Sequence, residues 1–138
     1  MKTIAIDFDG VIHAYSKGWQ DGSAYDVPLP GAIDGIKALM AKYAVFVLST
    51  RDSFQILEWF EKHAPEIGCD VIGNEKFWNT TGRLGITDRK LPAMVYIDDR
   101  AYRFTDWEVT SFRIDEWSSW PPTGAHVLTA LLGKLPKP

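Results

Sequence analysis

Short apolar runs alternate along the chain with segments whose apolar residues recur every three or four positions. The runs are rich in β-branched residues and predict buried strands at 2–7, 44–49, 69–73, 93–98 and 108–114. The recurring apolar positions predict helices at 30–43, 52–64 and 123–135. Strands that alternate with helices indicate an α/β domain with a mostly parallel central sheet and helices on both faces.

Composition narrows the class of protein without choosing a function. The 138 residues fit a single domain over 1–138, and 46% hydrophobic with 24% charged residues is the balance of a folded soluble protein. A net charge of −3 gives no basic surface for general nucleic-acid binding. Cys69 is the only cysteine, so an internal disulfide is excluded. We expect no membrane association and a cytoplasmic location, because neither a signal peptide nor an apolar run of about 18 residues is present.

Polar side chains that could act in catalysis or metal binding lie at or near the carboxyl ends of three predicted strands. In chain order they are Asp7, Asp9, Ser49, Lys90, Asp98 and Asp99. In open parallel sheets, ligands bind beyond the carboxyl ends of the strands, at the point where the strand order reverses. We therefore expect these side chains to meet at one edge of the sheet.

Four carboxylates at one place repel one another unless something neutralises them. A hard divalent cation with oxygen ligands and the ammonium group of Lys90 would both do so. With a cation bound, a phosphate dianion can approach this acidic site. Taken singly, "DFDG" can be a turn and "DD" a helix cap. A calcium loop is excluded for "DFDG" because the further oxygen ligands are missing and a strand precedes it.

The ordered set "DFDGVI", Ser49 after a strand, Lys90 and "YIDD" resembles the four motifs of the haloacid dehalogenase (HAD) superfamily, in its phosphatase branch, from residue 4 to about residue 104. The resemblance implies a three-layer Rossmann-like domain. It also implies a Mg²⁺-dependent phosphatase that hydrolyses phosphate monoesters through an aspartyl-phosphate intermediate. The expected partner is a phosphorylated small molecule or a nucleotide, with polynucleotides among the candidate substrates.

The resemblance also implies a role for each motif residue. Asp7 would be the nucleophile, and Asp9 would protonate the leaving oxygen and then activate water. Ser49 and Lys90 would hold the phosphoryl oxygens, and Lys90 would pair with Asp7. The implied Mg²⁺ ligands are Asp7, Asp9 through its main-chain carbonyl, Asp98 and Asp99.

Residues beside the motifs are candidates for substrate binding. Gly10 opens the turn after the first motif, and Thr50 and Arg51 follow the second predicted strand. Arg51 would reach a second phosphate or a nucleotide, or else form a surface ion pair. "STR" loosely resembles the "SGR" turn of polynucleotide 3′-phosphatases, but Thr50 stands in place of the glycine. Lys76 is a second candidate for the role of Lys90.

The spaces between motifs are too short for a separate cap domain. Only 20 residues lie between Asp9 and Pro30, and the segment that precedes Lys90 is also short. We therefore expect an open site covered only by residues 10–30, here called the flap. The flap residues that either pack the loop or contact a leaving group are His13, Tyr15, Trp19 and Tyr25. An open site resembles superfamily members that act on bulky phosphates or borrow a lid from another subunit.

Two alternatives of other classes remain open. A phosphotransferase would use the same intermediate and a different acceptor, and a non-catalytic phosphate- or metal-binding module would use the same fold. A receiver domain is disfavoured, because its acidic pair ends the first strand whereas "DD" here ends a later one. The tryptophan-rich segment 115–122 is interpreted as connection and packing, with base stacking as the less favoured alternative.

Overall fold

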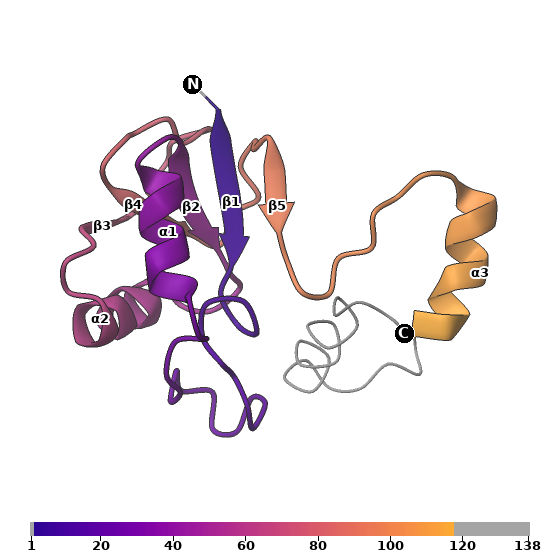
Figure 1. Ribbon diagram of the computed structural model, residues 1–138, viewed down its shortest axis with the longest axis horizontal. Helices are drawn as coiled ribbons and strands as arrows, with labels where there is room; N and C mark the ends of the chain where they lie inside the picture. Colours follow the sequence, from indigo (N-terminus) through magenta and orange to yellow (C-terminus); the bar gives the residue numbers. More distant parts are fainter. Residues whose placement is uncertain (1, 118–138) are drawn as a thin grey trace, which may run out of the picture.

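Five strands form the centre of the structure, a computed structural model that describes residues 2–117 (Figure 1). The strands are β1 (Thr3–Asp7), β2 (Ala44–Leu48), β3 (Cys69–Val71), β4 (Leu84–Thr87) and β5 (Val95–Ile97). The helices are α1 (Ala32–Met40), α2 (Ser53–His63) and α3 (Trp107–Trp117). The sheet has the order β3-β4-β2-β1-β5, and every neighbouring pair is parallel. The predicted α/β class with a mostly parallel sheet is therefore confirmed.

The strand order reverses beside β1. The chain runs from β1 through β2 to the edge strand β3, inserts β4, and then returns to place β5 on the other side of β1. The register pairs Asp7 with Leu48 and Ile6 with Ile97. The residues just after β2 and β5 therefore lie beside Asp7, at the place where open α/β sheets bind ligands.

Alternate residues of the strands fill two separate cores, one on each face of the sheet. The first core, under α1 and α2, includes Ile4, Ile6, Val45, Val47, Ile36, Ile56, Trp59 and Phe60. The second core consists of Ala5, Ala44, Phe46, Ile72, Trp78 and Leu91, so connecting segments rather than a helix supply its outer side chains. The prediction of helices on both faces is not met by residues 2–117, where α3 stands apart from the sheet (Figure 1).

Strand β4 has no counterpart in the predicted elements, because its sequence carries a weak signal. It has only four residues, and Gly85 at its second position lowers the strand preference. A Cβ atom on Gly85 would lie 2.7 Å from Ile72 Cδ1 and 2.9 Å from Trp78 Cε2. The second core therefore needs a glycine here, and the predicted strand 93–98 becomes the fifth strand instead of the fourth.

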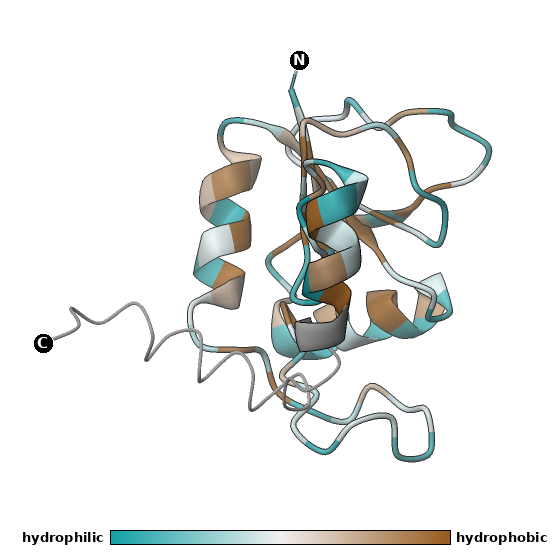
Figure 2. Ribbon diagram, turned by 90° about the vertical axis from the view of Figure 1, so that its right-hand side faces the viewer, coloured by the Kyte–Doolittle hydropathy of each residue, from teal (hydrophilic) through white to brown (hydrophobic). Residues whose placement is uncertain are grey.

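The predicted strand 108–114 is wrong, since these residues lie in α3. The carboxylate of Asp106 accepts a hydrogen bond from the main-chain N–H of Val109 at 2.8 Å, as an N-cap does. Such a cap favours a helix here, and strand preference, whose scale spans only about 1 kcal/mol per residue, is readily overridden by context. Apolar positions of α3 face solvent (brown in Figure 2), and Trp107 is 74% exposed. The predicted helix 123–135 and most of segment 115–122 lie outside the described residues.

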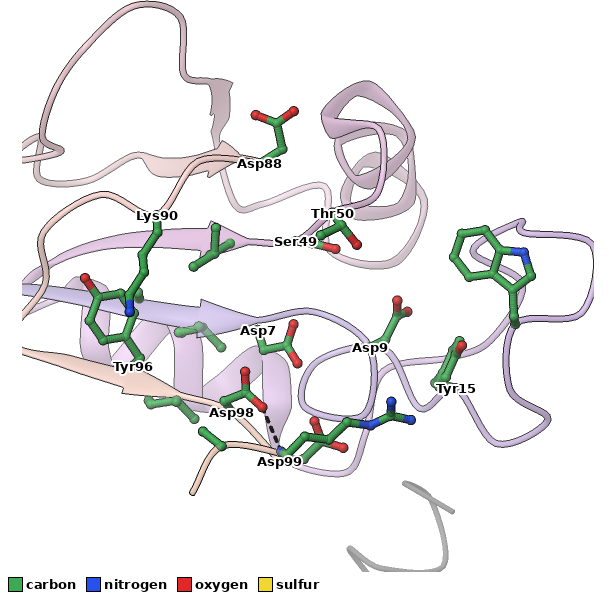
Figure 3. Close-up of a pocket in the computed structure, with 17 residues that line it drawn as sticks. Asp7, Asp9, Tyr15, Ser49, Thr50, Asp88, Lys90, Tyr96, Asp98 and Asp99 are labelled. Carbon is green, nitrogen blue, oxygen red and sulfur yellow. Dashed lines mark hydrogen bonds between the residues drawn. The ribbon is translucent and has the colours of Figure 1, made fainter. Parts of the chain in front are cut away.

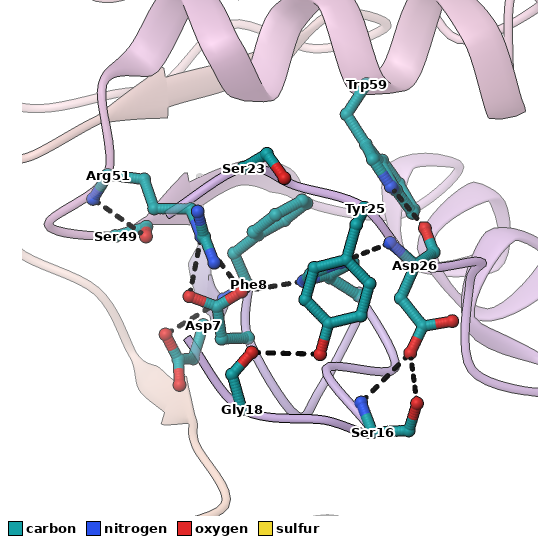
Figure 4. Close-up of polar contacts among 12 residues, drawn as sticks. Asp7, Phe8, Ser16, Gly18, Ser23, Tyr25, Asp26, Ser49, Arg51 and Trp59 are labelled. Carbon is teal, nitrogen blue, oxygen red and sulfur yellow. Dashed lines mark hydrogen bonds and ion pairs between the residues drawn. The ribbon is translucent and has the colours of Figure 1, made fainter. Parts of the chain in front are cut away.

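The flap (residues 10–30) consists of turns and isolated bridges, without a helix or an extended strand. Its two legs are joined by main-chain hydrogen bonds, from Ala14 N–H to the Val27 carbonyl at 2.9 Å and from Leu29 N–H to the Ile12 carbonyl at 2.8 Å. The indole N–H of Trp59 in α2 donates to the Asp26 carbonyl at 2.8 Å (Figure 4). The flap is thus a loop fastened to the sheet domain rather than a domain with its own core.

Candidate active site

A pocket of about 690 Å³ opens at the carboxyl ends of β1, β2 and β5 (Figure 3). All but two of the predicted site residues line it, and only Gly10 and Arg51 do not. The predicted residues in its wall are Asp7, Asp9, Ser49, Thr50, Lys90, Asp98 and Asp99. The strand register therefore brings together side chains that are up to 92 positions apart in the sequence numbering.

Three carboxylates in this pocket are close enough to share one cation. Asp7, Asp98 and Asp99 each offer an oxygen atom, and these atoms lie within 4.8 Å of one another. Asp7 ends β1, and the other two directly follow β5, the neighbouring strand. An all-oxygen donor set of carboxylates suits a hard divalent cation such as Mg²⁺.

Asp7 has an unusual protonation equilibrium. Burial and the neighbouring carboxylate of Asp98 raise the pKa of Asp7 to about 7, with smaller contributions from Asp99 and Asp9. The main-chain N–H of Phe8 donates to Asp7 Oδ1 at 2.9 Å and opposes this rise. A cation between the carboxylates would favour the ionised form of Asp7 and remove the conflict among like charges.

We expect the metal-free protein to lose stability as the pH rises from about 4 to about 7 and then to level off. In that range the folded state holds the proton of Asp7 more tightly than the unfolded chain, whose aspartates titrate near 3.8. Thermal unfolding measured in chelator between about pH 5 and 8 tests this. Asp7→Asn should flatten the slope, and an unchanged slope in that variant would assign it to other groups.

The carboxylate of Asp9 points away from the other three and toward two buried side chains. Arg51 Nε lies 3.0 Å from Oδ1 and 2.8 Å from Oδ2 of Asp9. His13 Nδ1 lies 2.7 Å from Asp9 Oδ1. Burial alone would raise the pKa of Asp9, but the hydrogen bonds from His13 and Arg51 and the charge of Arg51 hold it below its usual value. Asp9 is therefore charged at neutral pH.

The hydrogen-bond partners of His13 determine which of its ring nitrogens carries the proton. The main-chain N–H of Asp26 donates to His13 Nε2 at 2.9 Å, so Nε2 carries no proton. The proton is then on Nδ1, which donates to Asp9. The ring is fully buried and stacks on Phe8 at 5.1 Å between centroids. His13 therefore orients Asp9 from behind and has no exposed edge with which to contact a leaving group.

Arg51 lies inside the protein, only 3% exposed, although sequence reasoning proposed it as a substrate-binding residue. Its Nη1 atom donates to the Gly22 carbonyl at 2.6 Å and to Gln55 Oε1 at 3.1 Å. Gln55 Nε2 donates to the same carbonyl at 3.1 Å. The guanidinium therefore joins Asp9 to the flap and to α2.

Gly10 also makes its contacts within the protein. Its φ angle is 79°, a left-handed conformation that glycine adopts without strain, and its N–H donates to the His13 carbonyl at 2.8 Å. This N–H is thus already engaged, and the residue shapes the turn that carries Asp9.

The hydroxyl residues after β2 stand at the pocket wall. Ser49 is 7% exposed, and its Oγ accepts a hydrogen bond from the Arg51 N–H at 3.2 Å, which leaves the hydroxyl proton able to donate. Thr50 is exposed at the same wall. Both can donate to an anion held above Asp7.

Lys90 is a cationic residue of the pocket wall, as is Arg100, and sequence reasoning favoured it over Lys76. Lys90 lines the pocket and Lys76 does not. Its ammonium lies 5.0 Å from the centroid of the Tyr96 ring, and among residues 2–117 no carboxylate lies within 4.0 Å of it. The implied pairing of Lys90 with Asp7 is thus not formed in this structure, and the ammonium rests on Tyr96 at the pocket edge.

Several residues that line the pocket belong to no sequence motif. Asp88 follows β4, and recognising that strand would have placed this residue at the same sheet edge. Tyr96 belongs to β5, and its ring faces the pocket rather than the core. Tyr15 and Trp19 of the flap also line the pocket. Their positions depend on the path of the flap, which no periodicity in the sequence specifies.

Comparison with known proteins finds no family model, no curated protein and no solved structure that matches this chain. Within residues 2–117, no helix has the length and apolar character needed to cross a lipid bilayer. What the site does is therefore inferred from its own side chains and from the resemblance of its motifs.

Proposed function

We propose that the protein is a Mg²⁺-dependent phosphatase of the HAD superfamily, which hydrolyses phosphate monoesters of small molecules or nucleotides through an aspartyl-phosphate on Asp7. The observation that carries this proposal is the cluster of Asp7, Asp98 and Asp99 oxygens within 4.8 Å of one another at the switch point of the sheet. Ser49 and Lys90 in the same pocket support it. The proposed fold is the three-layer HAD-like domain, with the flap in place of a large cap.

Mg²⁺ would be held by Asp7, Asp98 and Asp99, with the main-chain carbonyl of Asp9 as the further ligand that the resemblance implies. Bound there, the ion would neutralise charge on the phosphate and on the carboxylates. The donor set fits the ion, because every group offered is an anionic or carbonyl oxygen.

In the first proposed step, a carboxylate oxygen of Asp7 attacks phosphorus while the bond from phosphorus to the leaving oxygen breaks. The leaving oxygen takes a proton from Asp9. In the second step, water gives a proton to Asp9 and attacks phosphorus, which releases phosphate and restores Asp7. Ser49 and Lys90 would hold the phosphoryl oxygens, since positioning and charge stabilisation carry most phosphoryl-transfer catalysis.

The low pKa of Asp9 suits the second step more directly than the first. As a carboxylate it is ready to accept a proton from water. To act first as an acid it must gain a proton, and a phosphate dianion close by favours that, because a neighbouring negative charge raises a carboxyl pKa. Arg51 and His13 keep the group oriented in both states.

Hydrolysis of a panel of phosphate monoesters, including p-nitrophenyl phosphate, tests the proposal. We expect phosphate release with Mg²⁺ and a rate lower by a factor of about 100 or more in chelator, because metal stabilisation is worth several kcal/mol. Added Mg²⁺ should restore the rate. Binding of Mg²⁺ and phosphate without turnover would instead identify a non-catalytic module. Transfer of the phosphoryl group only to an added alcohol or sugar would identify a phosphotransferase.

A further inference from the structure

The flap contributes two aromatic side chains, Tyr15 and Trp19, to the lining of the pocket. Tyr15 lies on the side of Asp9 that faces away from Lys90 (Figure 3). We propose that Tyr15 and Trp19 form a stacking wall that selects phosphate esters whose leaving group carries a planar aromatic ring, as nucleoside monophosphates do. This inference rests on the proposed function, because it assigns the leaving-group end of the same pocket.

The ring of Trp19 contacts other residues of the protein and is still partly exposed. The guanidinium carbon of Arg51 lies 4.7 Å from the ring centroid, a cation–π contact. A Cβ atom added to Gly22 would lie 3.0 Å from Trp19 Cζ2, so the backbone of the flap also packs closely against the ring. Trp19 is nevertheless 56% exposed and lines the pocket. The ring is thus held in place while much of its surface remains available to a ligand.

Tyr15 occupies a similar position beside the same guanidinium. Its ring centroid lies 5.8 Å from the guanidinium carbon of Arg51 and 5.9 Å from the centroid of His13. Arg51 and His13 are buried and bind Asp9 directly. Tyr15 therefore contacts both side chains that fix the proposed proton donor, and Trp19 contacts one of them, Arg51.

The flap backbone is strained around these two rings. Tyr15 has a φ of 54° and Gln20 a φ of 53°, left-handed conformations that are unfavourable for residues other than glycine. The hydroxyl of Tyr25 holds the turn between them, accepting from Lys17 N–H at 2.8 Å and donating to the Gly18 carbonyl at 2.9 Å. Strained residues are concentrated at ligand-binding segments, where the surrounding structure holds them in position.

The position of the rings assigns them to the leaving group. In the proposed reaction, phosphorus lies between Asp7 and the leaving oxygen, and that oxygen lies next to Asp9. Tyr15 is on the side of Asp9 remote from Asp7 (Figure 3). A leaving group bonded to that oxygen therefore extends toward the flap and meets the two rings. An aromatic surface stabilises a planar group by stacking, largely without regard to which base it carries.

The test compares kcat/KM for adenosine 5′-monophosphate with that for ribose 5-phosphate, two esters that differ by the aromatic base. We expect the wild-type protein with Mg²⁺ to favour the nucleotide about 5- to 150-fold, the range that stacking of one base supplies. Trp19→Leu, which keeps an apolar side chain without a planar face, should lower the ratio toward one, mainly through KM, with Tyr15 retaining part of the preference. Trp19→Phe, which keeps a planar face, should retain most of the preference.

Trp107→Ala is the matched control, because this tryptophan is 74% exposed on α3 and does not line the pocket. It should leave the ratio as in the wild type, and the thermal midpoint of each variant shows that it is folded. A wild type that hydrolyses both esters equally, or a Trp19→Leu protein that keeps the preference, would overturn the inference alone. A wild type that hydrolyses neither ester but releases phosphate from others in the panel, such as p-nitrophenyl phosphate, would also overturn the inference alone. A wild type that hydrolyses no phosphate monoester of the panel would overturn the proposed function and this inference with it.

Discussion

We expect Asp7→Asn to remove the proposed phosphatase activity and to leave the protein folded. An amide is not a competent nucleophile toward phosphorus, so the covalent step has no route, and we expect a loss of more than about 10⁴-fold in kcat/KM. The substitution also takes an anionic ligand from the carboxylate cluster. Phosphate release with Mg²⁺ and a substrate on which the wild type is active measures the loss.

Two further observations distinguish loss of the nucleophile from general damage. Acid quenching of the wild type with a ³²P-labelled substrate should leave label on the protein, and the Asp7→Asn variant should carry none. Asp34→Asn makes the same chemical change at an exposed position in α1 and should retain wild-type activity. Activity of Asp7→Asn within tenfold of the wild type would mean that another group attacks phosphorus.

Asp9→Asn is expected to lower kcat by about 10² to 10⁴, the usual contribution of a positioned acid–base group. The amide can neither protonate the leaving oxygen nor accept a proton from water. The loss should depend on the leaving group, since p-nitrophenolate departs without protonation whereas an alkoxide does not. We therefore expect the first step to be impaired far more for ribose 5-phosphate than for p-nitrophenyl phosphate.

Asp9→Asn can also lower activity by disturbing the structure, and the dependence on the leaving group distinguishes the two causes. The variant leaves the buried guanidinium of Arg51 without its ionic partner, and breaking such a pair is destabilising by about 3 to 5 kcal/mol. Thermal unfolding will report that cost. A misplaced backbone would slow formation of the phosphoenzyme from both substrates by the same factor, and such a result would make Asp9 a structural residue instead of the proton donor.

The part of the site that could be predicted is the part set by strand direction and register. Asp7 ends one strand and Asp98 follows its neighbour, so parallel pairing alone brings them to one edge. Ser49 joins them for the same reason after β2. No tertiary detail is needed for this, which is why the motifs indicate the pocket so directly.

The interior placement of Arg51 could not be predicted, because its partners come from distant segments. The carboxylate of Asp9 lies 42 positions away and the carbonyl of Gly22 lies 29 positions away. An arginine after a strand end ordinarily turns to solvent, and the Asp9 carboxylate together with the other acceptors of the guanidinium group makes the inward position favourable. The neutral form of His13 likewise depends on the main-chain N–H of Asp26, which no sequence pattern specifies.

The two errors in the predicted elements have local causes. The close packing of Trp78 leaves no space for a side chain at Gly85. The glycine required there weakens the strand signal of β4. In α3, the cap formed by Asp106 selects a helix for a sequence with high strand preference. In both places a single local contact decides the conformation of the segment. Periodicity and propensity describe only the average preference of each residue type and cannot show such a contact.

The hydrogen bonds from Arg51 and Gln55 to the Gly22 carbonyl fasten the flap to the residues beneath it, whereas Trp19 lines the pocket and is more than half exposed. Substitution of the exposed residues of that loop could therefore change the substrate while the buried residues beneath the loop keep their contacts. A loop built in this way separates the choice of molecule from the capacity to cleave it, which makes it a natural starting point for directed evolution.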